Sequence, residues 1–204
     1  MEKIIKKFFE DNNIKEPDKI NFEGIKKYIA YYKKWNKHYN ISSIKSDEAI
    51  LEKHFLDSFA LNHFISKGVV VDIGSGGGFP GLALKLVNEN IKLWSIDKCR
   101  KKISFQKMVC AQLDFKEVFF HEGDLKSFIY KENINFFVFR AVDKIETIFD
   151  WIYENLENAT AIYMTSNAEF KHVRAGAFKY EFKTYELPYS KQIHKLIKIK
   201  KESK

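Results

Sequence analysis

A run of glycines that follows an apolar segment is the part of this 204-residue sequence whose residue types and spacing could do chemistry. Residues 68–73 include three consecutive valines, and four of the five residues 74–78 are glycine. Since glycine has no side chain, such a loop can bend sharply and let a ligand come close to its backbone. Pro80 then suits the first turn of a following helix. Strand, glycine loop and helix in this order predict a cofactor site, and a glycine-rich turn without a ligand is the alternative.

Two registers of this loop predict two different cofactors. Residues 76–81 have the G-x-G-x-x-G spacing of nicotinamide-binding loops, but Pro80 then stands where the helix should offer N–H groups to a pyrophosphate. Residues 72–78 read D-x-G-x-G-x-G, with an acid that closes the strand before the glycines. That pattern resembles motif I of the class I S-adenosylmethionine (SAM) methyltransferases, whose cofactor has no pyrophosphate. The second register is favoured, and it places Gly74 and Gly76 at the cofactor.

Asp97 is the next candidate for cofactor binding. It follows the apolar run 91–96 and lies twenty-three residues after Gly74. In a doubly wound sheet this is where the second strand delivers a carboxylate to ribose hydroxyls. Because nicotinamide and SAM sites both use that carboxylate, Asp97 supports an adenosine-containing cofactor of either kind. The N-cap of the following helix is the other role open to it.

A sheet must position these residues, and the sequence from Gly68 onward predicts alternating strands and helices. Such alternation favours an α/β fold, a parallel sheet with helices on both faces. The last two stretches alternate apolar with polar residues on either side of Pro188 and predict an antiparallel hairpin at the sheet edge. Seven strands that end in such a hairpin are the arrangement of class I SAM-dependent methyltransferases. The predicted strands are 68–73, 91–96, 115–121, 134–139, 159–165, 178–187 and 193–200, and the predicted helices are 80–89, 98–113, 125–131, 144–156 and 167–175.

The residues before this sheet predict helices only, at 1–12, 21–38 and 47–65. We therefore expect an N-terminal helical extension over 1–66, packed on a SAM-binding methyltransferase domain over 67–204. One side of helix 21–38 carries five lysines, for which a solvated face is the default and contact with RNA the alternative.

His54 and Asp57 lie three residues apart in the predicted helix 47–65, so they should be neighbours on its surface. A catalytic His-Asp pair is one interpretation. An ordinary helix-surface pair or an interdomain contact is favoured over it.

Composition places the chain among globular proteins with a basic surface. Its 35 Lys and Arg residues against 27 Asp and Glu give a formal charge of +8, which favours polyanionic partners. A lysine-rich proteome is the alternative explanation. No apolar run is long enough to span a bilayer, and the first residues lack the apolar core of a secretory signal. The two cysteines and six histidines show no disulfide or metal-ligand spacing, so we expect a cytoplasmic protein without a metal site.

Four segments together resemble the RsmG family, also called GidB, which methylates N7 of a guanine in bacterial small-subunit ribosomal RNA. They are Trp35–Ile44, Leu51–Ser58, Asp72–Gly81 and Phe139–Ala141. The resemblance covers residues 25–200, and its Gly-Gly-Phe-Pro-Gly continuation is more specific than a general motif I. It implies SAM as cofactor and 16S rRNA as partner, in the 30S subunit or in an assembly intermediate.

Carried over residue by residue, the resemblance places Gly74 and Phe79 at the SAM site. It adds Arg140 at the end of the fourth strand, where ligands also bind in open α/β sheets. A salt-bridging arginine is the other role for that residue.

The segment after the third strand holds three more candidates for the cofactor site. The family's adenine-contacting pair matches Leu125 and Lys126, whereas methyltransferases in general use an acid such as Asp124. The chain departs from the family at Ser166-Asn167, where Lys-Gly is usual, and this removes a basic group from the rim of the substrate cleft.

Methylation of guanine N7 implies no general base, because N7 already carries an in-plane lone pair. Catalysis then consists in holding N7, the methyl carbon and sulfur in line, and the sequence names no catalytic residue. We expect the target base to leave its stack and the basic N-terminal helices to hold the phosphates around it. The remaining alternatives are a small-molecule methyltransferase, a nicotinamide oxidoreductase, and an RNA- or ribosome-binding assembly factor with a vestigial cofactor loop. Without a signal for self-association, a monomer is the expectation.

Overall fold

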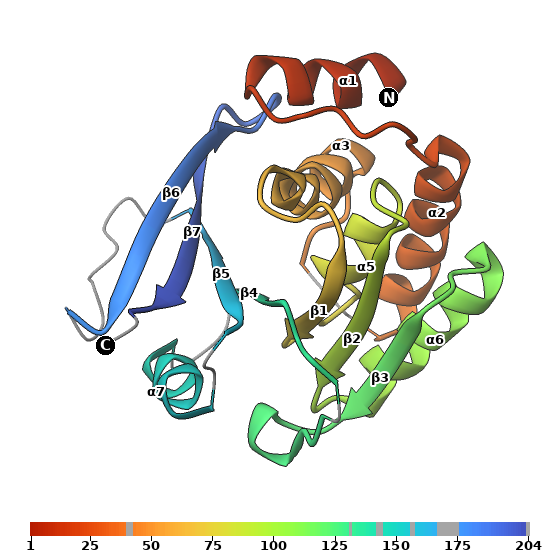
Figure 1. The fold of residues 1–204 in the computed structure, drawn as a ribbon. Helices are drawn as coiled ribbons and strands as arrows, with labels where there is room; N and C mark the ends of the chain where they lie inside the picture. Colours follow the sequence, from red (N-terminus) through yellow and green to blue (C-terminus); the bar gives the residue numbers. More distant parts are fainter. Residues whose placement is uncertain (40–42, 131, 142–144, 156–157, 167–175, 203–204) are drawn as a thin grey trace.

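The computed structural model describes residues 1–204 apart from 40–42, 131, 142–144, 156–157, 167–175 and 203–204. At its centre is a seven-stranded sheet of order β3-β2-β1-β4-β5-β7-β6 (Figure 1). Strands β1 to β5 run parallel, and β7 is antiparallel to both β5 and β6. This order confirms the predicted class I methyltransferase fold with its C-terminal hairpin. The strands are β1 (Gly68–Ile73), β2 (Ile91–Asp97), β3 (Val118–Glu122), β4 (Phe136–Arg140), β5 (Thr160–Thr165), β6 (Phe178–Glu186) and β7 (Ile193–Lys201).

Strand β1 lies between β2 and β4 and is covered on both faces. Its Val70 belongs to one hydrophobic cluster and its Val71 to another, because successive side chains of a strand point to opposite sides of the sheet. Val138 and Phe139 of β4 divide between the same two clusters. The uninterrupted apolar run of β1 is what a doubly covered strand requires.

Helices supply the two outer layers. α7 (Ile145–Asn155) packs on one face through Phe149, which shares a cluster with Val71. α5 (Gly81–Lys85) and α6 (Arg100–Leu113) lie on the other face together with the N-terminal helices (Figure 1).

Some predicted elements have different bounds in the structure. The helix predicted over 80–89 is α-helical only in α5, because the N–H groups of Leu86 and Val87 bond to carbonyls three residues back. Strand β3 begins at Val118, since Asp114 ends α6 in a left-handed conformation and the chain turns there. Within the segment 125–131 the helical part is the 3-10 turn η3 (Leu125–Ser127), and the predicted helix 167–175 lies outside the described residues.

The N-terminal residues form helices, as predicted, but one of them changes geometry. The helix expected over 47–65 is helical from 47 to 63, and its middle turn is a π-helix, a geometry often found at functional sites. Phe55 of that turn and Tyr28 pack against Phe79 beside the glycine loop, so the extension and the sheet share one hydrophobic cluster. The elements are α1 (Glu2–Asp11), α2 (Phe22–Tyr39), α3 (Asp47–Ile50), the π-helix η1 (Leu51–Leu56), α4 (Asp57–Phe59) and the 3-10 turn η2 (Ala60–His63).

Candidate functional site

A cleft opens at the carboxyl ends of the central strands, beside the N-terminal half of α7. Its volume is about 640 Å³, which lies within the range of cofactor sites. Ligands of open α/β sheets bind at this edge of the sheet. Five of the eight predicted cofactor residues line it, namely Gly74, Asp97, Asp124, Leu125 and Lys126.

The glycine loop leaves β1 and crosses the end of β2. The backbone N–H groups of Gly74 and Ser75 both donate to the carbonyl of Ile96 at 2.9 Å, and the N–H of Gly76 donates to the carboxylate of Asp97 at 2.8 Å. Gly74 and Gly76 have φ angles of 71° and 57°, in the left-handed region that glycine adopts most readily. The course of the loop therefore requires glycine at both positions.

Asp97 organises two backbone segments at the edge of the cleft. One oxygen accepts the N–H of Gly76 and the other accepts the N–H of Cys99, also at 2.8 Å. The N-cap position of α6 is Cys99 itself, so Asp97 supports the start of the helix without capping it. Each carboxylate oxygen retains a second lone pair, which can accept a ribose hydroxyl.

Asp72 is fully buried beneath the same loop. Its Oδ2 accepts the N–H of Gly81 at 2.7 Å, and its Oδ1 has no hydrogen-bond partner among the described residues. Burial raises the pKa of Asp72 to about 7, although the hydrogen bond from Gly81 and the charge of Arg140 act in the opposite direction. A ligand with a positive charge near the loop, such as a sulfonium or an ammonium group, would favour the ionised form of this carboxylate.

The remaining walls of the cleft suit a nucleoside. Asp124 accepts the N–H of Ser127 at 3.0 Å, and Lys98 Nζ lies 3.7 Å from its other oxygen. The hydrogen bonds with Ser127 lower the pKa of Asp124, and Lys98 acts in the same direction, so this rim carboxylate is ionised at neutral pH. Apolar surface for a planar base comes from Ile73, Ile96, Leu125, Ile148 and Trp151.

The other three predicted cofactor residues, Gly76, Phe79 and Arg140, are not among the described walls of the cleft. The ring of Phe79 is stacked between His54, at 4.5 Å between centroids, and Tyr28, at 5.3 Å. It therefore supports the loop from the side of the N-terminal helices. This packing could not be predicted from the sequence, because no local pattern indicates that the N-terminal helices cover the loop.

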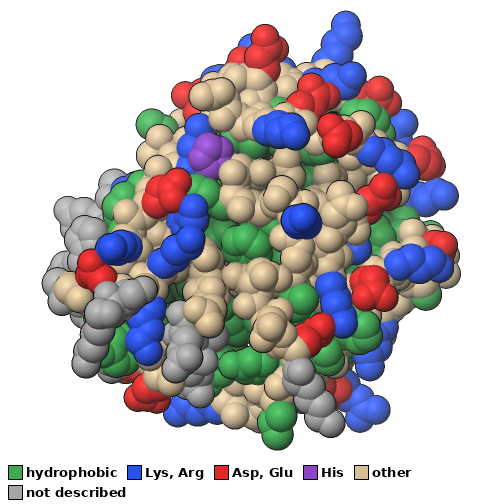
Figure 2. Space-filling view, viewed as in Figure 1, with side chains coloured by type: hydrophobic (Ala, Val, Ile, Leu, Met, Phe, Trp, Pro, Cys, Tyr) green, Lys and Arg blue, Asp and Glu red, His purple; other side chains and the backbone are tan. Residues whose placement is uncertain are grey.

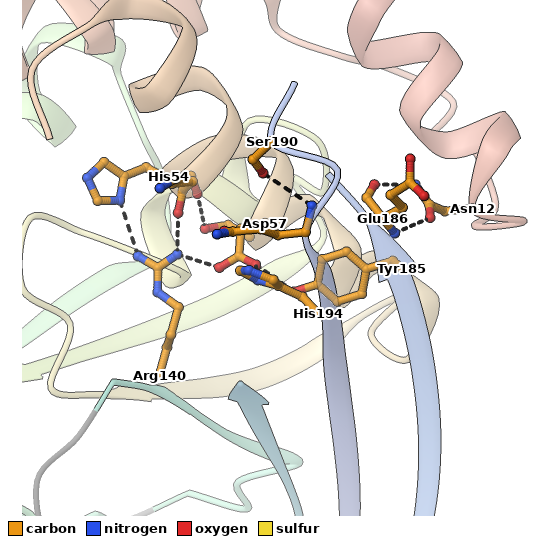
Figure 3. A network of polar contacts seen from close by, with 11 residues as sticks. Asn12, His54, Asp57, Arg140, Tyr185, Glu186, Ser190 and His194 are labelled. Carbon is orange, nitrogen blue, oxygen red and sulfur yellow. Dashed lines mark hydrogen bonds and ion pairs between the residues drawn. The ribbon is translucent and has the colours of Figure 1, made fainter. Parts of the chain in front are cut away.

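Arg140 ends β4 and turns toward the N-terminal helical segment, as Figure 3 shows. Its Nη1 lies 2.6 Å from Asp57 Oδ2 and donates to the carbonyl of Lys53 at 2.7 Å. The second oxygen of Asp57 accepts the hydroxyl of Tyr185 at 2.6 Å and lies 2.7 Å from Nδ1 of His194. The predicted alternative role of Arg140, an ion pair, is thus present in the structure.

The charge states in this network follow from burial and partners. Burial raises the pKa of Asp57, but the hydrogen bond from His194, the charge of Arg140 and the hydroxyl of Tyr185 outweigh it and lower the value to about 2. Burial lowers the pKa of His54 to about 3, and Arg140 adds to this effect. Its Nδ1 faces Nη2 of Arg140 at 3.4 Å as an acceptor, which leaves the proton on Nε2 beside Tyr32, 2.9 Å away.

Of the two interpretations favoured for His54 and Asp57, the solvent-exposed helix-surface pair is not what the structure shows. Both side chains are buried, with Asp57 1% exposed. Asp57 instead makes the long-range contact that was the other interpretation, since its partners lie in strands β4, β6 and β7.

Several lining residues were missed in the sequence. Lys98 and Ala141 directly follow Asp97 and Arg140, so the rule that ligands bind beyond strand ends would have found them. Ile73, Ile96 and Gly123 also lie at or directly after strand ends, whereas Lys102 of α6 and three residues of α7 come from helices whose orientation the sequence does not give. The missed residues are Ile73, Ile96, Lys98, Lys102, Gly123, Ala141, Thr147, Ile148 and Trp151.

The charged surface is mixed on the face shown in Figure 2, where Lys and Arg side chains are interspersed with Asp and Glu. The five lysines of α2 are exposed, as predicted: Lys26, Lys27, Lys33, Lys34 and Lys37. Ser166 is exposed directly after β5, and Asn167 lies outside the described residues. In the described part of the chain no group of three His, Cys, Asp or Glu side chains is placed to hold a metal ion, and no helix is long and apolar enough to cross a membrane.

Residues 21–197 match the GidB family model, described as rRNA small subunit methyltransferase G. Ribosomal RNA small subunit methyltransferase G of Fusobacterium nucleatum subsp. nucleatum is 30% identical over 203 residues, which cover 92% of this chain and 86% of that protein. The protein of the same name from Geotalea uraniireducens is 43% identical over 95 residues, which cover 45% of this chain and 43% of that protein.

A solved structure of a mutant of MtNAS in complex with S-adenosylmethionine superposes with a TM-score of 0.58. The match covers 97% of this chain and 77% of that chain at 17% identity. Likeness at this level of identity shows a shared fold.

Proposed function

This chain belongs to the GidB family of rRNA small subunit methyltransferase G, and from this premise we propose that it methylates N7 of a guanine in 16S rRNA. It is a SAM-dependent methyltransferase of small-subunit ribosomal RNA. The observation that carries the proposal is the cleft itself, in which a glycine loop preceded by an acid meets the carboxylate of Asp97 at the ligand-binding edge of the sheet.

When bound, SAM supplies a methyl group on a positively charged sulfur. We assign Gly74 to its backbone contact, Asp97 to its ribose hydroxyls, and Asp124, Leu125 and Lys126 to the adenosine end of the cleft. Three residues have an indirect role in this proposal, because they hold the loop and the end of β4 without lining the cleft: Gly76, Phe79 and Arg140. The orphaned oxygen of the buried Asp72 supports a cationic ligand at this loop.

Bound SAM would supply its methyl group to the in-plane lone pair of guanine N7, with the carbon–sulfur bonding electrons left on sulfur and the positive charge on the base. No proton would have to leave the base. The two acids of the described lining are Asp97 and Asp124, which accept hydrogen bonds from backbone N–H groups. Neither has to act as a base in this reaction. The chain contributes orientation of the reacting atoms and exclusion of water.

In this proposal the substrate is the 30S subunit or an assembly intermediate, and the protein acts in the cytoplasm as a monomer. The formal charge of +8 supports a polyanionic partner. The exposed lysines of α2 are the candidates for its phosphates.

Transfer of tritiated methyl groups to 30S particles from cells that lack this protein tests the proposal. With the wild-type protein we expect label in 16S rRNA, at a nucleotide whose strand is cleaved by borohydride and aniline, as 7-methylguanine is. Gly74→Asp should abolish transfer and SAM binding because its side chain enters the cleft. Gly176→Asp is the matched control, since that glycine also has a positive φ of 84° and none of the described residues lies within 4 Å of an added Cβ; this variant should transfer normally.

Each rival function gives a different result. Label on another atom of the RNA would contradict N7 as the target. Binding to 30S particles without transfer would favour an assembly factor with a vestigial loop. Calorimetry in which NADH binds and SAM does not would overturn the assignment of the cleft, as would wild-type SAM affinity in Gly74→Asp.

A further inference from the structure

The ion pair of the buried Asp57 and the partly buried Arg140 joins the N-terminal helical segment to the end of β4. Side-chain exposure is 2% for Asp57 and 19% for Arg140, with 2.6 Å between Oδ2 and Nη1. The guanidinium also meets the Lys53 carbonyl and His54 Nδ1, both from the π-helix η1. One helical segment thus surrounds the end of this side chain on several sides (Figure 3).

Asp57 is held in turn by the C-terminal hairpin. Tyr185 of β6 donates its hydroxyl to Oδ1, and His194 of β7 contacts the same oxygen through Nδ1. The pKa of Asp57, lowered to about 2 because these partners and Arg140 outweigh burial, keeps it ionised at every pH at which the protein would be assayed. The carboxylate is therefore a fixed negative charge that links three distant parts of the chain.

The end of β4 is also a wall of the cleft. Ala141 follows Arg140, lines the cleft, and has a φ of 47°. A residue with a Cβ is strained in this left-handed region and keeps that conformation only where its surroundings restrain the backbone. Arg140, paired with Met164 of β5 through the backbone and anchored to Asp57 through the side chain, is the nearest such support.

Charge gives the pair a second consequence. During transfer a positive charge moves from sulfur to the base, so a further unpaired cation beside the reacting atoms would raise the barrier. Asp57 neutralises Arg140 and directs it away from the cleft. Without that partner a partly buried guanidinium is left without its counter-ion, which is unfavourable, so the side chain would move to another position.

We propose that Asp57 is a positioning residue for methyl transfer, which holds and neutralises Arg140 and so fixes the end of β4 and the turn at Ala141 beside the cleft. This rests on the proposed function. The role is indirect, because Asp57 contacts neither the cleft nor its ligand.

Asp57→Asn tests the proposal, since the amide has the same shape but no charge. We expect kcat for methyl transfer to fall on the order of tenfold or more, while the Kd of S-adenosylhomocysteine in calorimetry changes by less than about threefold. In the ligand-free protein, backbone amides of 139–141 should exchange hydrogen faster than in the wild type. Asp11→Asn, which removes an exposed carboxylate paired only with Lys7 in the described contacts, is the matched control and should change none of these.

A second substitution separates positioning from folding. In Asp57→Asn/Arg140→Gln the unpaired cation is gone, so kcat of the double variant should exceed that of Asp57→Asn. If the two substitutions acted independently, their separate losses of kcat would multiply and the double variant would be slower. All rates are compared below the melting transition of each variant.

The proposal would be overturned if Asp57→Asn kept the wild-type kcat and the wild-type rate of amide hydrogen exchange. It would also be overturned if the loss of kcat equalled the unfolded fraction of the variant, or if the affinity for S-adenosylhomocysteine fell as much as kcat. Absence of transfer by the wild-type protein is a different result, since it removes the proposed function and the positioning role with it.

Discussion

At the scale of single residues, the buried Asp72 beneath the glycine loop makes the stability of the protein depend on pH. Its ordinary pKa of 3.8 is raised to about 7 by burial. Between these two values the folded protein holds a proton that the unfolded chain has lost. The contribution of Asp72 to the free energy of unfolding is therefore fully favourable below about pH 4 and is lost as the pH rises through about 7.

Asp72→Asn should remove this pH dependence, because the neutral amide can still accept the N–H of Gly81. We expect the free energy of unfolding of the variant, relative to the wild type, to rise by on the order of 2 kcal/mol between pH 5 and pH 8. Urea unfolding of both proteins at the two pH values measures it. A difference that stays constant over this range would contradict the burial of an unpaired carboxylate.

The residues that sequence reasoning located are those whose neighbours are close in the chain. Gly74 and Asp97 follow apolar runs, and a strand end can be recognised from local pattern alone. The partners of Asp57 lie between 83 and 137 residues away, so its ion pair and its burial could not be derived from the spacing of His54 and Asp57. Phe79 follows the glycines in the sequence, but its packing between His54 and Tyr28 depends on η1 and α2, which are distant in the chain.

At the scale of elements, helix α2 supports the glycine loop from outside. The hydroxyl of Tyr28 donates to the carbonyl of Gly77 at 2.7 Å, and a Cβ on Gly78 would lie 2.1 Å from that hydroxyl oxygen. Gly78 also has a φ of 86°. The loop and the helix therefore fit each other only with glycine at this position.

Two substitutions and their combination test this contact. Tyr28→Phe leaves the Gly77 carbonyl without its partner and should cost about 1–3 kcal/mol of stability. Gly78→Ala should cost about 2–4 kcal/mol through strain and overlap. In the double variant the hydroxyl that collides with the new methyl group is absent, so the total loss should be smaller than the sum by about 1 kcal/mol.

The control for this cycle is Tyr31→Phe on the same helix, whose hydroxyl bonds to the exposed side chain of Gln112 at 3.2 Å. Its effect should add to that of Gly78→Ala. Additivity in both cycles, measured by urea unfolding, would show that α2 does not restrain the loop.

The strands were predictable because periodicity and turn residues are local, and the alternating pattern around Pro188 also predicted the antiparallel hairpin. The π-helix was not predictable. Glu52 lies in it fully enclosed, with one carboxylate oxygen accepting the N–H groups of Tyr189 and Ser190 at 2.6 and 2.7 Å. An amphipathic pattern predicts that a charged residue at this position faces solvent. Its partners in the hairpin turn are distant in the sequence and meet it only in the folded chain.

At the scale of the whole molecule, we propose that residues 1–66 form an extension packed on the methyltransferase domain 67–204 and do not fold apart from it. One hydrophobic cluster contains Phe8, Phe55 and Leu61 from the extension together with Val70 and Leu82. Asn12 adds two hydrogen bonds to the backbone of Glu186, between α1 and the edge strand β6. Segments from near both ends of the chain thus pack against each other.

The central claim is that the cleft beyond β1, β2 and β3 is the cofactor site of a methyltransferase. The most direct test is a crystal structure of the protein with S-adenosylhomocysteine. We expect the nucleoside in the cleft, with its ribose at Asp97, its base near Leu125 and its amino-acid end at the loop that begins with Gly74. An empty cleft at saturating ligand, or the nucleoside bound elsewhere, would contradict that assignment.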